Sequence, residues 1–202
     1  MTEKGLAIIE KDIHTQFVKE FNTPPTQIIY SPGRVNIIGE HTDYNEGFVL
    51  PMAIDRYLVM AFSKRNDKKV RVLSTDFSER IEFDIAKIRK GEFSWGEYIT
   101  GCFWALSAEE KDLSGFDMVI TANIPVGASL SSSAALELGI LRAISFCAES
   151  SWKPMKMALL GQKVENDWVG MNCGIMDQAI CGCGKKNHAI LIDCRNLSLK
   201  PC

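Results

Sequence analysis

The chain of 202 residues is 46% hydrophobic and has a formal net charge of −2, a composition that indicates an ordinary globular protein and excludes a disordered one. A balance this close to neutral also lacks the broad basic surface by which many proteins bind nucleic acid. No basic segment followed by an apolar core opens the chain, and no apolar run approaches the ~20 residues that span a membrane, so we expect a cytosolic protein.

The first 85 positions divide into one helix and a set of strands. Apolar residues recur at three- and four-residue steps over 6–21, which predicts an amphipathic helix that ends at the Asn-Thr-Pro-Pro segment 22–25. From 27 to 85, short apolar or alternating runs are separated by Gly, Asn, Asp and Pro, a pattern that predicts a mostly antiparallel sheet. The densest basic run, 64–69, lies between two of these runs and is predicted to be the solvated tip of a hairpin.

Helices return after position 93. The pattern predicts helices over 95–107, 132–149 and 154–168, and a strand over 116–124. No repeat or low-complexity linker interrupts the chain. We therefore expect one domain, 1–202, of the α+β class, with a mixed, largely antiparallel sheet packed with helices.

The seven cysteines are scattered over the second half of the chain, beginning at Cys102. An odd number in a chain of this size argues against a secreted disulfide framework, so we expect reduced thiols. The close pair Cys181 and Cys183 has no second pair or nearby histidine at zinc-finger spacing. Buried or incidental thiols are therefore the favoured interpretation of this pair.

The strand predicted at 116–124 runs into a loop of small residues, PVGASLSSS (125–133), and then into a long helix. Small residues at a helix N-terminus let backbone N–H groups converge on an anion, and the helix dipole favours negative charge there. A serine that merely caps the helix explains the same residues. The loop lacks the lysine of GxxxxGK[ST], and the protein-kinase motifs are also absent. A bound nucleotide would therefore need charge compensation from Mg²⁺ and an arginine.

An abrupt change of character marks the segment PGRVNIIGEHTDY (32–44). An apolar run ends at Gly39 and is followed at once by Glu40, His41 and Asp43. A simple hairpin needs no such cluster of polar side chains. The three could ligate a metal, although neighbouring residues rarely complete a coordination sphere by themselves, or they could form a polar turn.

Three segments together resemble the galactokinase branch of the GHMP small-molecule kinases: SPGRVNIIGEHTDYNEGFVLP, PVGASLSSSAALE and CGIMDQ. The first is close to the galactokinase signature, whereas the serine-rich loop is shared by the wider superfamily and indicates only that ATP is bound. The resemblance covers nearly the whole chain. It implies a GHMP-kinase N-terminal lobe and an ATP-dependent sugar kinase with Mg²⁺ as its metal.

The resemblance implies that the polar residues after Gly39 bind the hydroxyl groups of a sugar. This role agrees with the chemistry, because a polyol needs several donors and acceptors that converge from a rigid strand end. The implied sugar site consists of Glu40, His41, Thr42, Asp43 and Gly174.

Two further residues are implied to act in the reaction. Asp177 corresponds to the catalytic aspartate of the family, and it lies in what reads as the first turn of a short helix, where a carboxylate stays ionised and accepts a proton. Arg34 corresponds to the arginine beside this aspartate and the transferred phosphoryl group, where a fixed positive charge stabilises developing negative charge. A surface arginine is the alternative interpretation.

The resemblance also implies a site for MgATP. Ser133 and Glu165 correspond to the magnesium ligands, a hydroxyl and a carboxylate that suit a hard cation; without the resemblance, Glu165 would be read as an exposed helix charge. Trp95 and Tyr98 resemble the aromatics of the adenine pocket, with packing in the core as the alternative. The implied phosphate loop consists of Gly127, Ala128, Ser129, Leu130, Ser131, Ser132 and Ser133.

Two departures from the family pattern stand out. The loop usually reads Gly-x-Gly-Leu-Ser-Ser-Ser, and here Ser129 replaces the second glycine. If Ser129 has a positive φ, the exchange costs on the order of 1 kcal/mol and weakens ATP binding. The later glycine-rich motif of galactokinases, and the tyrosine that completes the sugar site, have no counterpart before Cys202. We therefore expect the isolated chain to be inactive and to self-associate.

The sequence thus favours a galactokinase that transfers the γ-phosphoryl of MgATP to the anomeric hydroxyl of α-D-galactose. Galactose and MgATP are the expected partners, with no nucleic acid and no membrane. A non-catalytic sensor that binds galactose and ATP is the rival, because the phosphate loop is altered. A kinase for N-acetylgalactosamine is the third reading, since one substituent on the sugar cannot be read from these motifs.

Overall fold

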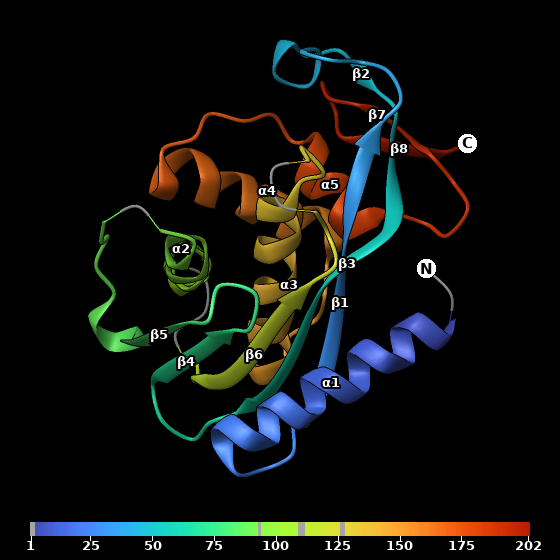
Figure 1. Ribbon diagram of the computed structural model, residues 1–202. Coiled ribbons are helices and arrows are strands. Elements are labelled where there is room, and N and C mark those ends of the chain that lie inside the picture. The colour runs from blue at the N-terminus through green and yellow to red at the C-terminus, as the bar shows by residue number, and fades with distance from the viewer. Residues whose placement is uncertain (1–2, 93, 109–111, 126–127) are drawn as a thin grey trace.

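Figure 1 shows the computed structural model of the protein, which describes residues 3–92, 94–108, 112–125 and 128–202. Five strands form the main sheet in the order β1-β3-β6-β4-β5. Neighbouring strands are antiparallel except β4 and β6, which are parallel. This arrangement confirms the predicted mixed, largely antiparallel sheet. The strands are β1 (Gln27–Asn36), β3 (Pro51–Lys64), β6 (Phe116–Ala122), β4 (Lys69–Ser74) and β5 (Glu79–Asp84).

The basic turn between β3 and β4 is not the tip of a hairpin, and the prediction for 64–69 was wrong in this respect. β6 lies between the two strands and pairs with both of them. Local periodicity carries no signal for such a long-range insertion. Carboxylates hold the basic side chains of this turn: Arg65 binds Asp67 and Asp117, and Lys68 binds Asp112.

One face of the sheet is covered by α1 (Glu3–Phe21), which confirms the helix predicted over 6–21. Side chains alternate between the two faces of a strand, so every second residue of β3 points toward this helix. Val59 and Ala61 of β3 are buried there together with Ile13 and Phe17 of α1. α1 crosses the front of the sheet in Figure 1.

The remaining helices cover the opposite face and enclose the larger core (Figure 1). They are α2 (Gly96–Ser107), α3 (Ser132–Cys147), α4 (Pro154–Lys163) and α5 (Met176–Cys183). The helix predicted over 154–168 is not one α-helix, because the six residues Val164–Val169 form a π-helical turn after α4. Turns of this kind are rare and are often found at functional sites.

A second, three-stranded sheet lies at the end of the molecule that carries the C-terminus (Figure 1). It consists of β2 (Phe48–Val49), β7 (Ile190–Asp193) and β8 (Ser198–Pro201). All seven cysteines are free thiols. In the ranges that the structure describes, no helix combines the length and apolar character needed to cross a membrane.

Candidate active site

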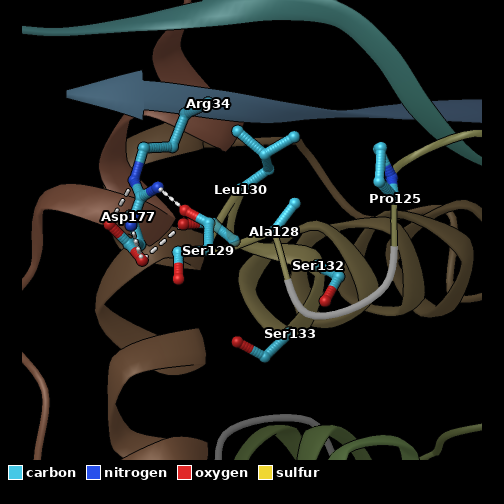
Figure 2. A pocket seen from close by; sticks show the side chains of 9 residues that line it. Arg34, Pro125, Ala128, Ser129, Leu130, Ser132, Ser133 and Asp177 are labelled. Atoms are coloured by element: carbon cyan, nitrogen blue, oxygen red, sulfur yellow. Dashed lines mark hydrogen bonds and ion pairs between the residues drawn. The ribbon is translucent and has the colours of Figure 1, made fainter.

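A charged pair joins the first strand to the last helix at the centre of the candidate site. Arg34 extends from β1 and binds Asp177 in the first turn of α5 through two hydrogen bonds, Nε to Oδ1 at 2.7 Å and Nη2 to Oδ2 at 2.6 Å. Figure 2 shows this pair, with the third guanidinium nitrogen, Nη1, donating to the carbonyl oxygen of Ser129 at 2.7 Å. A bidentate pair of this kind fixes the orientation of the carboxylate.

The fold places Arg34 by means of an irregularity in β1. The register of β1 against β3 shifts between Pro32 and Arg34, and such a bulge re-aims the side chains that follow it. The backbone N–H of Arg34 donates to Leu130 O at 3.1 Å, which ties the strand to the loop before α3. The strand, the loop and α5 therefore meet at one point.

The serine loop adopts strained backbone conformations at two positions. Ser129 has φ 53° and Ser131 has φ 59°, both in the left-handed region that favours glycine. Ser129 thus has the positive φ at which replacing glycine with serine costs about 1 kcal/mol. Gly127, the first glycine of the predicted loop, lies outside the described residues.

Ser131 shows that the serine-cap interpretation was wrong at this position. It occupies the N-cap of α3, yet its side chain makes no capping hydrogen bond. Its hydroxyl donates instead to Oδ2 of Asp177 at 2.5 Å. Asp177 therefore accepts hydrogen bonds from a strand arginine and from the serine loop at once.

Two neighbouring cavities meet at the first turn of α3. The polar one has a volume of about 330 Å³ and contains the Arg34–Asp177 pair; the other has about 340 Å³ and is largely apolar. Ser132 and Ser133 line both cavities, and Figure 2 shows their side chains at the start of α3. The polar cavity is completed by Pro125, Ala128, Ser129, Leu130 and Ser131.

Trp95 and Tyr98, the two aromatics singled out in the sequence, both line the apolar cavity. They also pack against the main core, so the two interpretations of these residues are compatible. Burial, with a smaller contribution from nearby carboxylates, raises the pKa of Tyr98 to about 12. Sequence reasoning missed Phe77, whose ring lies 6.1 Å from that of Trp95 and whose side chain is 51% exposed. A phenylalanine in the polar turn between two strands was the available signal.

The polar loop after β1 folds around Gly39, which has φ 105°. The Thr42 hydroxyl lies 2.7 Å from the carbonyl oxygens of both Gly39 and Phe48, so it braces the loop from within. Glu40 and His41 are exposed, and His41 contacts the Tyr44 hydroxyl. None of the hydrogen bonds between described residues ties Glu40 or His41 to the Arg34–Asp177 pair.

Asp43 reaches the segment just before α5. A Cβ at Gly174 would lie only 1.9 Å from Oδ2 of Asp43, so a side chain at that position cannot coexist with this arrangement. Gly174 is buried and stands three residues before Asp177. The structure thus brings together two of the predicted sugar-binding residues, Asp43 and Gly174, at the segment that leads into the helix of Asp177.

The predicted metal ligands are placed differently from each other. Ser133 faces both cavities, whereas Glu165 lies in the π-helical turn, is only 8% exposed, and accepts a hydrogen bond from Gln178 at 2.7 Å. Glu165 is therefore not an exposed helix charge. In the described ranges no group of three or more His, Cys, Asp or Glu side chains could hold a metal ion. A hydroxyl and a carboxylate suit Mg²⁺ that takes its other ligands from phosphate and water.

Two family models match the chain. Residues 15–64 match the galactokinase galactose-binding signature, and residues 97–185 match the N-terminal domain of the GHMP kinases. The first match contains Arg34 and the loop after Gly39. The second contains the serine loop and Asp177.

Solved structures share the fold. The Lactococcus lactis galactokinase complexed with galactose is 36% identical, with a TM-score of 0.89 over 96% of this chain and 51% of that chain. The Methanococcus jannaschii mevalonate kinase is 22% identical, with a TM-score of 0.71 over 86% and 55%. The Streptococcus pneumoniae phosphomevalonate kinase in complex with phosphomevalonate and AMPPNP is 16% identical, with a TM-score of 0.66 over 85% and 51%. The chain spans about half the length of these structures.

Proposed function

The chain belongs to the galactokinase branch of the GHMP kinases, as an N-terminal portion, and from this premise we propose that it forms the N-terminal half of an enzyme that phosphorylates galactose. The full-length enzyme transfers the γ-phosphoryl of MgATP to the anomeric hydroxyl of α-D-galactose. The products are galactose 1-phosphate and ADP.

The observation that carries this proposal is the position of Asp177. Its carboxylate is held by Arg34 on one side and by the Ser131 hydroxyl on the other, at the wall of the polar cavity. The segment that precedes it contacts Asp43 at Gly174. A group placed between a sugar-binding loop and a phosphate loop is placed to act on both substrates.

In the proposed reaction, Asp177 accepts the proton of the anomeric hydroxyl. The hydroxyl oxygen forms its bond to the γ-phosphorus while the bond from that phosphorus to the β–γ bridging oxygen breaks. Arg34 places a fixed positive charge beside the transferring group. The bond from Arg34 to Ser129 O sets the separation between the aspartate and the phosphate loop, so positioning supplies much of the rate.

The two cavities suit the two ends of a nucleotide. The apolar cavity accepts adenine between Trp95, Tyr98 and Phe77, and the serine loop accepts the phosphates. Ser133 and Glu165 would hold Mg²⁺. The ion would neutralise charge on the β- and γ-phosphate oxygens, which compensates for the absence of a lysine in the loop.

The test is a substrate panel on the full-length enzyme with MgATP. Galactose, N-acetylgalactosamine, glucose and arabinose are each scored for sugar 1-phosphate and ADP. We expect galactose to be turned over best. Preference for N-acetylgalactosamine would reassign the substrate, and no turnover of any sugar, with galactose and ATP both bound, would identify a sensor.

The sensor remains the second candidate because of the positive φ of Ser129. We expect Ser129→Gly to tighten MgATP binding by up to about fivefold, the equivalent of about 1 kcal/mol, because glycine has no Cβ to oppose the close approach of a phosphate to the loop. Ser129→Ala is the matched control, because it keeps the Cβ and should leave the affinity near that of the wild type. Calorimetric titration of both variants measures the difference. Equal affinity of the glycine and alanine variants would show that a Cβ at position 129 does not hinder nucleotide binding.

A further inference from the structure

Three buried polar side chains lie behind the candidate site, and the proposed function assigns a role to only one of them. Glu137 of α3 and Gln178 of α5 are 0% exposed, and Glu165 of the π-helical turn is 8% exposed. The side-chain amide nitrogen of Gln178, Nε2, donates to Glu165 Oε2 at 2.7 Å and to Glu137 Oε2 at 3.1 Å. One carboxamide thus joins two carboxyl groups from different elements.

This arrangement is energetically unfavourable in isolation. Two carboxyl groups share one amide group away from water, and burial, reinforced by the charge of Glu165, raises the pKa of Glu137 well above its ordinary value. Among the residues that the structure describes, the second carboxyl oxygen of Glu137 and the single carboxamide oxygen of Gln178, both named Oε1, are buried without a hydrogen-bond partner. Apolar residues of similar size would stabilise such a core position at least as well. Uncompensated polar groups of this kind are most common where function requires them.

The absence of a side chain at Gly161 of α4 makes room for Gln178 and Glu137. A Cβ at Gly161 of α4 would lie 3.0 Å from Cγ of Gln178 and 3.2 Å from Oε2 of Glu137. A larger residue at Gly161 would therefore push against both side chains.

Each member of the trio is linked to a group that the proposed reaction uses. Gln178 follows Asp177 directly on α5. Glu137 stands four residues after Ser133 on α3, so the two lie on the same face of that helix. Glu165 is itself the proposed magnesium ligand. The Gln178 carboxamide therefore connects the three elements that carry the base, the phosphate-loop hydroxyl and the metal carboxylate.

We propose that Gln178 is a positioning residue: its hydrogen bonds to Glu165 and to Glu137 fix the Glu165 carboxylate and the first turn of α5 relative to the start of α3. The proposal rests on the proposed function for the roles of Glu165 and Asp177. Its consequence is that loss of the carboxamide affects the metal and the phosphoryl transfer more than the sugar, because its hydrogen bonds go to Glu165, Glu137 and the Cys173 thiol, and none of these residues belongs to the loop 40–43.

The experiment compares Gln178→Met with wild type in the full-length enzyme. Mn²⁺ binding is followed by electron paramagnetic resonance in the presence of a non-hydrolysable ATP analogue, and galactose binding by calorimetry. We expect the Mn²⁺ dissociation constant to rise and kcat to fall by roughly 10-fold or more, the usual scale when a residue that orients a metal ligand is removed. Galactose affinity should stay within about twofold of wild type.

Variants of Glu137 keep the test decisive if Gln178→Met does not fold. Glu137→Gln retains an oxygen acceptor for Gln178 and should stay near wild type in Mn²⁺ affinity and kcat. Glu137→Met removes that anchor without leaving a buried charge, so it should keep its melting temperature yet fall between wild type and Gln178→Met in Mn²⁺ affinity. If Gln178 and Glu137 have a purely structural role, the Mn²⁺ affinity of each variant should instead fall in step with its melting temperature.

Phe17→Leu is the control for general destabilisation, because Phe17 is fully buried between α1 and the sheet, on the face of the sheet opposite the trio. Gln178→Met and Glu137→Met that match Phe17→Leu in Mn²⁺ affinity and kcat would overturn the proposal. The binding assay also separates the positioning role of Gln178 from the proposed kinase function. Weakened Mn²⁺ binding in a full-length protein that phosphorylates no sugar supports the positioning role and refutes the kinase.

Discussion

Replacing Asp177 with asparagine in the full-length enzyme is expected to lower kcat by at least about 10²-fold, the usual scale for a positioned acid-base group, while galactose still binds. The amide has nearly the same shape as the carboxylate but cannot take the proton of the anomeric hydroxyl. It also presents a donor in place of one of the two carboxylate oxygens that accept hydrogen bonds from Arg34 and Ser131. Steady-state kinetics and calorimetry with galactose measure the two effects separately.

The chain contains a matched control for this substitution. Asp193 is bound by Arg195 in the same bidentate manner, Nε to Oδ1 at 2.8 Å and Nη2 to Oδ2 at 2.6 Å, and it lines neither of the two cavities of the site. Asp193→Asn therefore removes an equivalent ion pair without touching the proposed chemistry. We expect it to keep kcat within about twofold of wild type. Near-normal turnover in Asp177→Asn would refute the role of general base.

Periodicity was enough to predict most elements of this fold. The helix that contains Ile13 and Phe17 shows its apolar face directly in the sequence, and the structure buries that face against the sheet. The insertion of β6 between β3 and β4 could not be found in this way, because it depends on contacts between segments about 50 residues apart, such as Val72 with Met118. Local pattern reports local structure alone.

In the candidate site, too, the sequence indicates single residues but not the long-range contacts between them. The resemblance indicated Arg34 and Asp177 separately, and the structure adds their bidentate contact, which no spacing of 143 positions predicts. The hydroxyl of Ser131 turns from the helix it precedes to Asp177, contrary to the ordinary preference of serine for capping. Glu137 gave no signal, because a glutamate in an otherwise apolar helix reads as a surface residue until its burial is known.

The isolated chain of residues 1–202 is expected to show no detectable galactose phosphorylation, with activity only in the full-length enzyme. Phosphoryl transfer requires that both substrates be held in line and shielded from water. The sugar loop does not provide this alone, since Glu40 and His41 are exposed to solvent. A sensitive assay for sugar 1-phosphate on both proteins measures the difference, and full activity of the 202-residue species would contradict the proposal that it is half of an enzyme.

The same chain is expected to self-associate through the apolar side chains around the sugar loop. Ile37, Ile38, Tyr44 and Phe48 are all at least 50% exposed, and they gather within 12 positions next to the second sheet. Exposed apolar clusters of this kind promote association between protein molecules. Ile37→Lys should lower the apparent mass measured by light scattering, whereas Ile8→Lys on α1 is the matched control because both isoleucines are 55% exposed. An equal response to both substitutions, or a monomer without either, would show that this surface does not drive association.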